Sequence, residues 1–217
     1  MWWIPVILVG GYVAKKIFED DESPPQRVNS VKSILELNLL RLRGELENST
    51  TQNIAIIGQP GSGKSTLLRA LTKGKCTPLP VIGQKTDATA WHSDLDVNLF
   101  HYYQGIQFVD IPGYDTSQHP VESYLKYFPF SKFDKLIFVI NSKIHDSDAK
   151  VFNEIIKSGL NDVILVRNNS DGLDDYIGVF NDIDKIFNIK NNGLELVFSS
   201  NKTLEGRERL VEFCEIS

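Results

Sequence analysis

Short apolar runs, separated by amphipathic or polar stretches, make up most of the chain after residue 50. The runs NIAII, KLIFVIN and DVILVR are nearly continuous, which is typical of parallel strands covered on both faces. Together with the segments between them, they predict alternating strands and helices and hence an α/β fold with a doubly wound sheet. We expect strands at Asn53–Gly58, Asp96–Tyr103, Gln107–Ile111, Lys135–Asn141, Asp162–Arg167 and Glu195–Ser199. We expect helices at Lys64–Thr72, His119–Phe128, Asp146–Ser158, Leu173–Phe187 and Leu204–Phe213, and a polar loop at Lys73–Ser93.

The first 18 residues form an apolar segment whose only charged side chains are Lys15 and Lys16. A helix of its first 14 residues would be about 21 Å long, shorter than the ~30 Å hydrocarbon core of a bilayer. The lysines follow the apolar run, which favours a cytoplasmic location for the remainder of the chain. We expect residues 1–18 to be a membrane anchor; the alternative is a helix or strand docked on the protein's own surface.

Two further segments precede the main domain. Residues 19–28 are acidic and contain prolines, which predicts a linker. Residues 29–50 carry apolar side chains at helical spacing, so we expect an amphipathic helix from Asn29 or Ser30 that packs on the domain at residues 51–217. A helix that binds a partner is the alternative.

The strongest motif directly follows the first predicted strand. Residues 58–66, GQPGSGKST, match the pattern G-x-x-x-x-G-K-[ST]. The glycines allow successive backbone N–H groups to point at one anion, and the following helix places its positive dipole end beneath it. The residues expected to contact nucleotide phosphates are Gly58, Gln59, Pro60, Gly61, Ser62, Gly63, Lys64, Ser65 and Thr66. The alternative is a glycine-rich turn followed by a lysine.

Three more motifs each lie at the end of a predicted strand. In DIPG, residues 110–113, the Asp110 carboxylate can hold Mg²⁺ through water and the Gly113 N–H can reach a γ-phosphate. In VRNNSDG, Asp171 can accept both the N1–H and N2–H₂ donors of guanine, a pair that adenine lacks. Asn168 can bond the other edge of the purine or tie its loop to the phosphate loop. In SSN, at Ser199, Ser200 and Asn201, backbone N–H groups can reach the guanine O6.

The order GxxxxGKS, Thr, DxxG, N-x-x-D, SS resembles the motif set of the translation-factor-related (TRAFAC) P-loop GTPases, over roughly Asn53 to Phe213. Within that class, the opening Gly58-Gln59-Pro60 and the stretch VIGQKTDATA at residues 81–90 are most similar to Era-like bacterial GTPases and interferon-inducible immunity-related GTPases. The resemblance implies a P-loop NTPase G domain at residues 51–217, with a mostly parallel six-stranded sheet containing one antiparallel strand, and an N-terminal helical extension.

The resemblance also implies ligands and roles. GTP or GDP would be the ligand, with Mg²⁺ bound by Ser65, Thr89 and Asp110; Thr86 is the alternative to Thr89. Lys64, Thr89 and Gly113 would act in slow, Mg²⁺-dependent GTP hydrolysis. Loss of the γ-phosphate would release the loops that contain Thr89 and Gly113, so the protein would work as a switch.

The chain departs from the family pattern at three positions. Asn169 stands where the family's fourth motif has a lysine, which predicts weaker binding of the base. Tyr114 stands where Ras-like enzymes have a water-orienting glutamine, so the active site would be completed in another way, such as a homodimer across the nucleotide face. Gly61 stands where potassium-activated members have asparagine. His119 would orient water only if its loop folds inward; the ordinary interpretation is a solvated loop histidine.

Composition narrows the class without naming a function. Hydrophobic residues are 41% and charged residues 24% of the chain, as in globular proteins. The net charge of −5 argues against nucleic-acid binding through a general basic surface, so we expect no nucleic-acid partner. The two cysteines, Cys76 and Cys214, indicate ordinary reduced thiols. An ATP-binding P-loop protein and a nucleotide-binding scaffold without significant turnover remain as alternatives.

Overall fold

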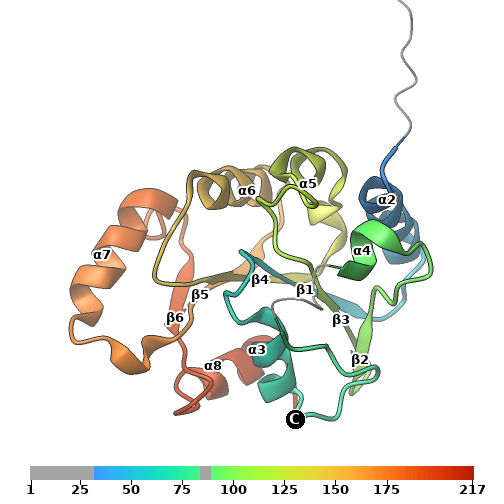
Figure 1. Ribbon diagram of the computed structural model, residues 1–217. Helices are drawn as coiled ribbons and strands as arrows, with labels where there is room; N and C mark the ends of the chain where they lie inside the picture. Colours follow the sequence, from blue (N-terminus) through green and yellow to red (C-terminus); the bar gives the residue numbers. More distant parts are fainter. Residues whose placement is uncertain (1–31, 84–88) are drawn as a thin grey trace, which may run out of the picture. The chain divides into compact units, whose positions relative to one another are not determined.

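Six strands form one sheet in the order β2-β3-β1-β4-β5-β6. The computed structural model describes residues 32–83 and 89–217, and Lys32–Ser217 is one compact unit (Figure 1). The strands are β1 (Gln52–Gly58), β2 (His101–Tyr103), β3 (Ile106–Asp110), β4 (Lys135–Ile140), β5 (Asp162–Arg167) and β6 (Glu195–Phe198). Strand β2 runs antiparallel to β3, whereas β3, β1, β4, β5 and β6 are parallel.

Helices cover both faces of this sheet, which explains why its central strands are apolar throughout (Figure 1). One face packs against α2 (Ile34–Glu47), α4 (Thr89–Ser93), α5 (Val121–Tyr127), α6 (Asp146–Lys157) and α7 (Tyr176–Phe187). The other face packs against α3 (Lys64–Leu71) and α8 (Arg207–Phe213). Two short 3₁₀ helices, η1 (Phe130–Lys132) and η2 (Ser170–Gly172), lie in the connections.

Helix α2 is part of the core. Its apolar stripe of Leu35, Leu39, Leu42 and Leu46 is buried against the sheet and the neighbouring helices. The helix begins at Ile34, later than the predicted start at Asn29 or Ser30. A capping box sets this start, because the Ser33 hydroxyl accepts from the Glu36 N–H and the Glu36 carboxylate accepts from the Ser33 N–H.

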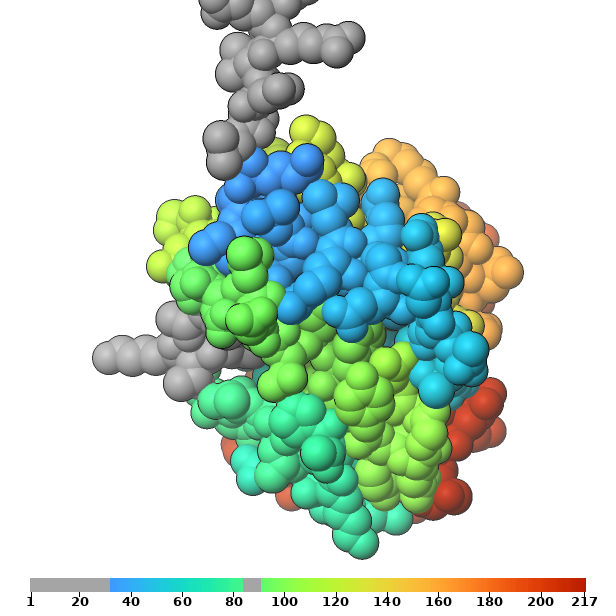
Figure 2. Space-filling model, turned by 90° about the vertical axis from the view of Figure 1, so that its right-hand side faces the viewer, coloured from blue at the N-terminus to red at the C-terminus, as the bar shows by residue number. Residues whose placement is uncertain are grey.

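Helix α2 also fixes the segment that follows α4. The Asn38 side-chain amide donates to the carbonyls of Trp91 and Asp94, each at 2.8 Å, and the Arg41 guanidinium donates to those of Leu95 and Val97. Figure 2 shows α2, in blue, lying directly against this segment, in green.

These side-chain bonds account for one wrong prediction. Residues 96–100 were expected to extend strand β2, but the strand begins only at His101. The Arg41 guanidinium donates to the carbonyl of Val97, so this carbonyl pairs with a side chain instead of with a neighbouring strand. The predicted loop at Lys73–Ser93 also differs, since its last residues form helix α4.

Helix α7 starts at Tyr176, later than the predicted Leu173, because the Asp175 carboxylate caps it by accepting from the Gly178 N–H at 2.8 Å.

The expected membrane anchor at residues 1–18, the linker at residues 19–28 and the alternative switch residue Thr86 lie outside the described residues. No helix within residues 32–83 and 89–217 has both the length and the apolar character needed to cross a membrane.

The bonds of Asn38 generate a stability prediction. Replacement Asn38→Ala leaves two backbone carbonyls without their donors, so we expect the free energy of unfolding to fall by about 1–3 kcal/mol. Urea denaturation measures this change. The control is Leu37→Ala on the same helix, because Leu37 is 39% exposed and its loss should change stability by less than about 0.5 kcal/mol. Equal midpoints for wild type and Asn38→Ala would contradict the assigned role.

Candidate functional site

The predicted motifs converge because parallel strands end at one edge of the sheet. The phosphate loop follows β1, the DIPG sequence begins at the last residue of β3, and the loop with Asn168 and Asp171 follows β5. Ser199 and Ser200 follow β6 at the same edge. Thr89 does not follow a strand of this edge but is the first residue of α4.

The phosphate loop ends in the backbone geometry that an anion site requires. Helix α3 begins at Lys64, and its N-cap residue Gly63 has a left-handed backbone with φ of 94° and no side chain to cap the helix. The N–H groups of the first turn therefore remain directed at the loop, together with the positive end of the helix dipole. The Lys64 ammonium lies along the loop and donates to the Gln59 carbonyl at 3.0 Å.

A buried hydrogen bond joins the phosphate loop to the loop after β5. The Asn168 side-chain amide, fully buried, donates to the Ser62 carbonyl at 2.7 Å. Gly63 permits this approach, since a Cβ at that position would lie 2.1 Å from the Asn168 amide nitrogen. Of the two roles considered for Asn168, the structure therefore shows the tie to the phosphate loop.

Asp110 and Gly113 lie beside the phosphate loop. Asp110 ends β3, in register with Ile56 of β1, and is 7% exposed. Gly113 touches the phosphate loop so closely that a Cβ there would lie 2.2 Å from the Pro60 backbone nitrogen. Any side chain at position 113 would have to displace one of the two loops.

The donor set at this edge suits Mg²⁺. The hydroxyl of Ser65, on the first turn of α3, and the carboxylate of Asp110 are hard oxygen ligands of the kind this ion prefers. The part of the chain that the structure describes contains no cluster of three or more His, Cys, Asp or Glu side chains arranged to hold a metal. Mg²⁺ commonly takes one or two protein ligands and completes its shell with phosphates and water, so the residues fit.

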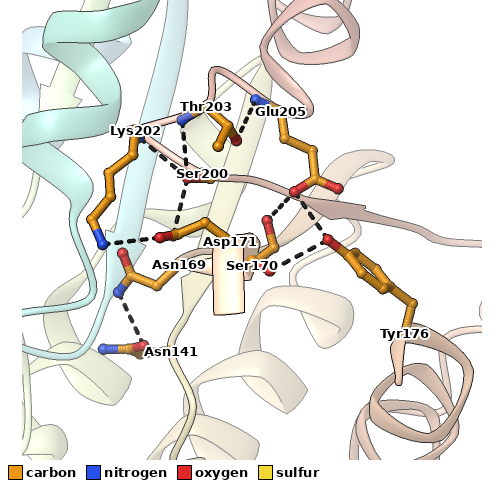
Figure 3. A network of polar contacts seen from close by, with 9 residues as sticks. All are labelled: Asn141, Asn169, Ser170, Asp171, Tyr176, Ser200, Lys202, Thr203 and Glu205. Carbon is orange, nitrogen blue, oxygen red and sulfur yellow. Dashed lines mark hydrogen bonds and ion pairs between the residues drawn. The ribbon is translucent and has the colours of Figure 1, made fainter. Parts of the chain in front are cut away.

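The Asp171 carboxylate belongs to a polar network, drawn in Figure 3. One oxygen accepts from the Ser200 hydroxyl at 3.0 Å, and the other accepts from the Lys202 ammonium at 2.9 Å. The bond from Lys202, and then that from Ser200, lower the pKa of Asp171. The ionised form, which can accept two N–H donors of a base, is therefore favoured.

Lys202 is the site residue that sequence analysis missed. The family lysine is replaced by Asn169, whose side-chain amide points away from Asp171 to the Asn141 side chain at 3.2 Å (Figure 3). Lys202 instead brings a basic group to this loop from the segment after β6. The only signal in the sequence was a lysine directly after SSN, and its pairing with Asp171 depends on tertiary structure.

Two of the three backbone N–H groups of SSN, those of Ser199 and Ser200, have acceptors within the fold. The Ser199 N–H donates to the Arg167 carbonyl at 2.9 Å, and the Ser200 N–H donates to the Glu205 carbonyl at 3.3 Å. Both N–H groups are thus engaged within the fold, and contact with a guanine O6 would require these bonds to break. The contribution of Ser200 here is its hydroxyl, which holds Asp171.

Two side chains after Gly113, those of Tyr114 and His119, are buried in the core. Tyr114 is fully buried, and its hydroxyl donates to the Asp148 carboxylate at 2.5 Å. Burial, reinforced by that carboxylate, raises the pKa of Tyr114 well above its usual value. The ordinary interpretation of His119 as a solvated loop histidine is wrong, because its side chain is 0% exposed.

Comparison with known proteins places this geometry in a family. Residues 53–169, more than half of the chain, match the model of the family described as "50S ribosome-binding GTPase". The chain belongs to this family, which confirms the resemblance to TRAFAC P-loop GTPases.

Two curated relatives extend the comparison. GTPase Der from Rippkaea orientalis is 30% identical over 140 residues, which are 60% of this chain and 29% of Der. Interferon-gamma-inducible GTPase 10 from Mus musculus is 27% identical over 111 residues, 48% of this chain and 25% of that protein. The chain thus spans about a quarter to a third of the length of the curated relatives it matches.

Solved structures support the fold. A probable GTP-binding protein engB superposes with a TM-score of 0.54 at 16% identity, over 74% of this chain and 95% of that one. A variant of Era from Aquifex aeolicus, bound to GDP and AlF4⁻, superposes with a TM-score of 0.52 at 23% identity, over 74% and 54% of the two chains. The predicted G-domain fold, with one antiparallel strand in a mostly parallel six-stranded sheet, is confirmed.

Burial of His119 predicts a pH dependence of stability. Burial, and then the charges of His92 and Lys64, lower the pKa of His119 to about 4. In the unfolded chain the pKa returns to about 6.5, so below that pH the unfolded state binds a proton that the folded state does not. This contribution to stability is complete above pH 6.5 and is lost as the pH falls toward 4, by at most about 1.4 kcal/mol per pH unit.

Urea unfolding of wild type and His119→Phe between pH 4.5 and 7.5 measures this effect. The phenylalanine variant lacks the titrating group, so its stability should fall less steeply with acid than that of wild type. His145→Ala, which removes an exposed histidine, should follow wild type. Parallel curves for wild type and His119→Phe would refute the assigned pKa.

Proposed function

We propose that this chain binds a guanine nucleotide with Mg²⁺ and hydrolyses GTP slowly, acting as a nucleotide-controlled switch. The observation that carries the proposal is the 2.7 Å hydrogen bond from the Asn168 amide to the Ser62 carbonyl. It fixes the loop of Asp171 against the phosphate loop, so one ligand with a base at one end and phosphates at the other suits the site. The family match and the fold support this choice of ligand.

Each motif has a role in this proposal. Lys64 and the backbone N–H groups of residues 58–66 hold the β- and γ-phosphates, and the N–H of Gly113 meets the γ-phosphate. Ser65, Thr89 and Asp110 hold Mg²⁺, with Asp110 acting through water. When bound, Mg²⁺ neutralises charge that develops on the phosphates during transfer. The chain's own contribution is positioning and electrostatic stabilisation.

Base selection rests on Asp171. Its ionised carboxylate accepts from N1–H and N2–H₂ of guanine, whereas adenine offers no such pair of donors. Lys202 and Ser200 support this role, since they hold the carboxylate from two sides while it lies at the surface of η2. The family's fourth motif has a lysine where this chain has Asn169. Lys202 supplies the missing positive charge from a different position.

The proposed hydrolysis is slow because the usual water-orienting residue is missing. The side chain after Gly113 is Tyr114, which is held in the core by Asp148. A second copy of the chain, bound across the nucleotide face, would accelerate such an enzyme. The exposure of Leu79, Val81 and Ile82 supports this proposal. These apolar side chains, in the segment leading to the predicted switch, are 45%, 57% and 46% exposed.

The proposal includes a cytoplasmic G domain tethered to a membrane by residues 1–18, supported by the apolar sequence of that segment. It does not include RNA. One solved structure of Era contains MgGDPNP and nucleotides of 16S ribosomal RNA, with a TM-score of 0.52 to this chain at 25% identity. The net charge of −5 argues against RNA as a partner of this chain, because RNA phosphates attract basic surfaces.

Exchange of one side chain tests base selection. Asp171→Asn replaces an acceptor of two N–H groups by an amide, so we expect GDP and GTP affinity to fall by about 10²-fold. Xanthine carries a carbonyl where guanine has N2–H₂, and the asparagine amide matches it as donor. The variant should therefore bind XDP more tightly than wild type does, as measured by titration calorimetry with Mg²⁺.

The matched control is Asp174→Asn, which changes an exposed carboxylate three residues further along and should leave GDP binding unchanged. Equal binding of ATP and GTP, unaffected by Asp171→Asn, would favour an ATP-binding protein instead. Tight GDP retention with no multiple turnover would favour a nucleotide-binding scaffold.

A further inference from the structure

The imidazole of His119 is a buried polar group that none of the proposed roles uses. Its side chain is 0% exposed, and within residues 32–83 and 89–217 neither ring nitrogen has a hydrogen-bond partner. Nearly all buried polar atoms in folded proteins are paired, because an unpaired one costs the free energy of its desolvation. An unpaired ring in this position is explained most directly by a ligand or water that it meets during function.

The loop that carries His119 fixes its backbone and leaves its ring unbonded. The His119 N–H donates to the Thr116 hydroxyl at 2.9 Å and to the Thr116 carbonyl at 3.2 Å. The Thr116 N–H donates in return to the His119 carbonyl at 3.2 Å. The residue is thus held in place without any structural hydrogen bond to its imidazole.

The ring packs against helix α4. It meets the His92 ring of α4 edge-on, with centroids 5.2 Å apart and planes at 76°. The charge of Lys64 contributes to the lowered pKa of His119, after burial and the charge of His92. His119 therefore lies against the helix that begins at Thr89, in the loop whose Gly113 touches the phosphate loop at Pro60.

Tyr114, directly after Gly113, is not available to contact a ligand or water. The Tyr114 hydroxyl donates to Asp148 inside the core, and Asp148 also accepts from the His145 N–H at the start of α6. Withdrawal of Tyr114 would break a short buried hydrogen bond and expose an aromatic ring. His119 is the next side chain of this loop that is fully buried.

We propose that His119 orients the water that attacks the terminal phosphate of GTP, by accepting a hydrogen bond from that water at a ring nitrogen. This inference rests on the GTPase function proposed above. The water oxygen bonds to the γ-phosphorus, and the bond from that phosphorus to the β–γ bridging oxygen breaks, leaving its electron pair on GDP. The protons of the water leave with the phosphate product, so His119 carries no net proton away.

The protonation state of the ring suits this role. A neutral imidazole has one acceptor nitrogen and one donor nitrogen, whereas a protonated ring has no acceptor. Burial, and then the charges of His92 and Lys64, keep the pKa of His119 at about 4. The ring is thus neutral near pH 7, and either tautomer retains an acceptor for the water.

Single-turnover hydrolysis by the full chain tests the inference. His119→Phe keeps an aromatic ring against His92 and removes the acceptor, so we expect the rate with bound GTP to fall by about 10²-fold. Affinity for GDP should stay within about threefold of wild type, because the ring does not hold the nucleotide. Binding of AlF4⁻ to the GDP complex, which mimics the attacked phosphate with its water, should be lost. In His119→Ala, added imidazole should restore part of the rate.

The control is His145→Ala, an exposed histidine at the start of α6, which should hydrolyse GTP like wild type. Hydrolysis by His119→Phe within threefold of wild type would overturn the inference and leave the GTPase function intact. A loss of GDP affinity equal to the loss of rate would also overturn it, by assigning His119 to the fold of the site. If wild type itself neither bound nor hydrolysed GTP, the proposed function would fail first.

Discussion

The hydrogen bond from the Asn168 amide to the Ser62 carbonyl is the contact on which the site depends. It joins two loops that are 106 residues apart in the chain, and it lies where solvent does not compete. This hydrogen bond requires glycine at position 63, because a Cβ there would collide with the amide nitrogen of Asn168. The phosphate loop and the loop of Asp171 are thereby held at a fixed separation, and under the proposed function a nucleotide that spans both loops meets a preformed site.

Around this fixed part, the remaining elements are anchored by side chains to backbone carbonyls and to the core. Helix α2 lies outside the range matched by the family, yet Asn38 and Arg41 bind the segment after α4. On the other side, Tyr114 is buried and bonded to Asp148. The side chain after Gly113 therefore stabilises the core. In the same loop, the imidazole of His119 is buried without a hydrogen-bond partner among the described residues.

The sequence predicted the parts of the fold that depend on local pattern. Near-continuous apolar runs gave β4 and β5 to within a residue, since only buried parallel strands tolerate such runs. The length of β2 and the burial of His119 were missed because they depend on partners far away in the chain, such as Arg41 and His92. The same holds for Lys202, whose ion pair with Asp171 follows no spacing rule.

The central claim is that the carboxyl edge of the sheet forms a guanine-nucleotide site. Titration calorimetry of the full wild-type chain with GDP, GTP and ATP in the presence of Mg²⁺ tests it most directly. The account predicts that both guanine nucleotides bind at least about 10²-fold more tightly than ATP, since only guanine satisfies Asp171. Equal affinity for ATP would contradict the assignment of Asp171 to guanine but not the assignment of the phosphate loop. Absence of binding would contradict both assignments.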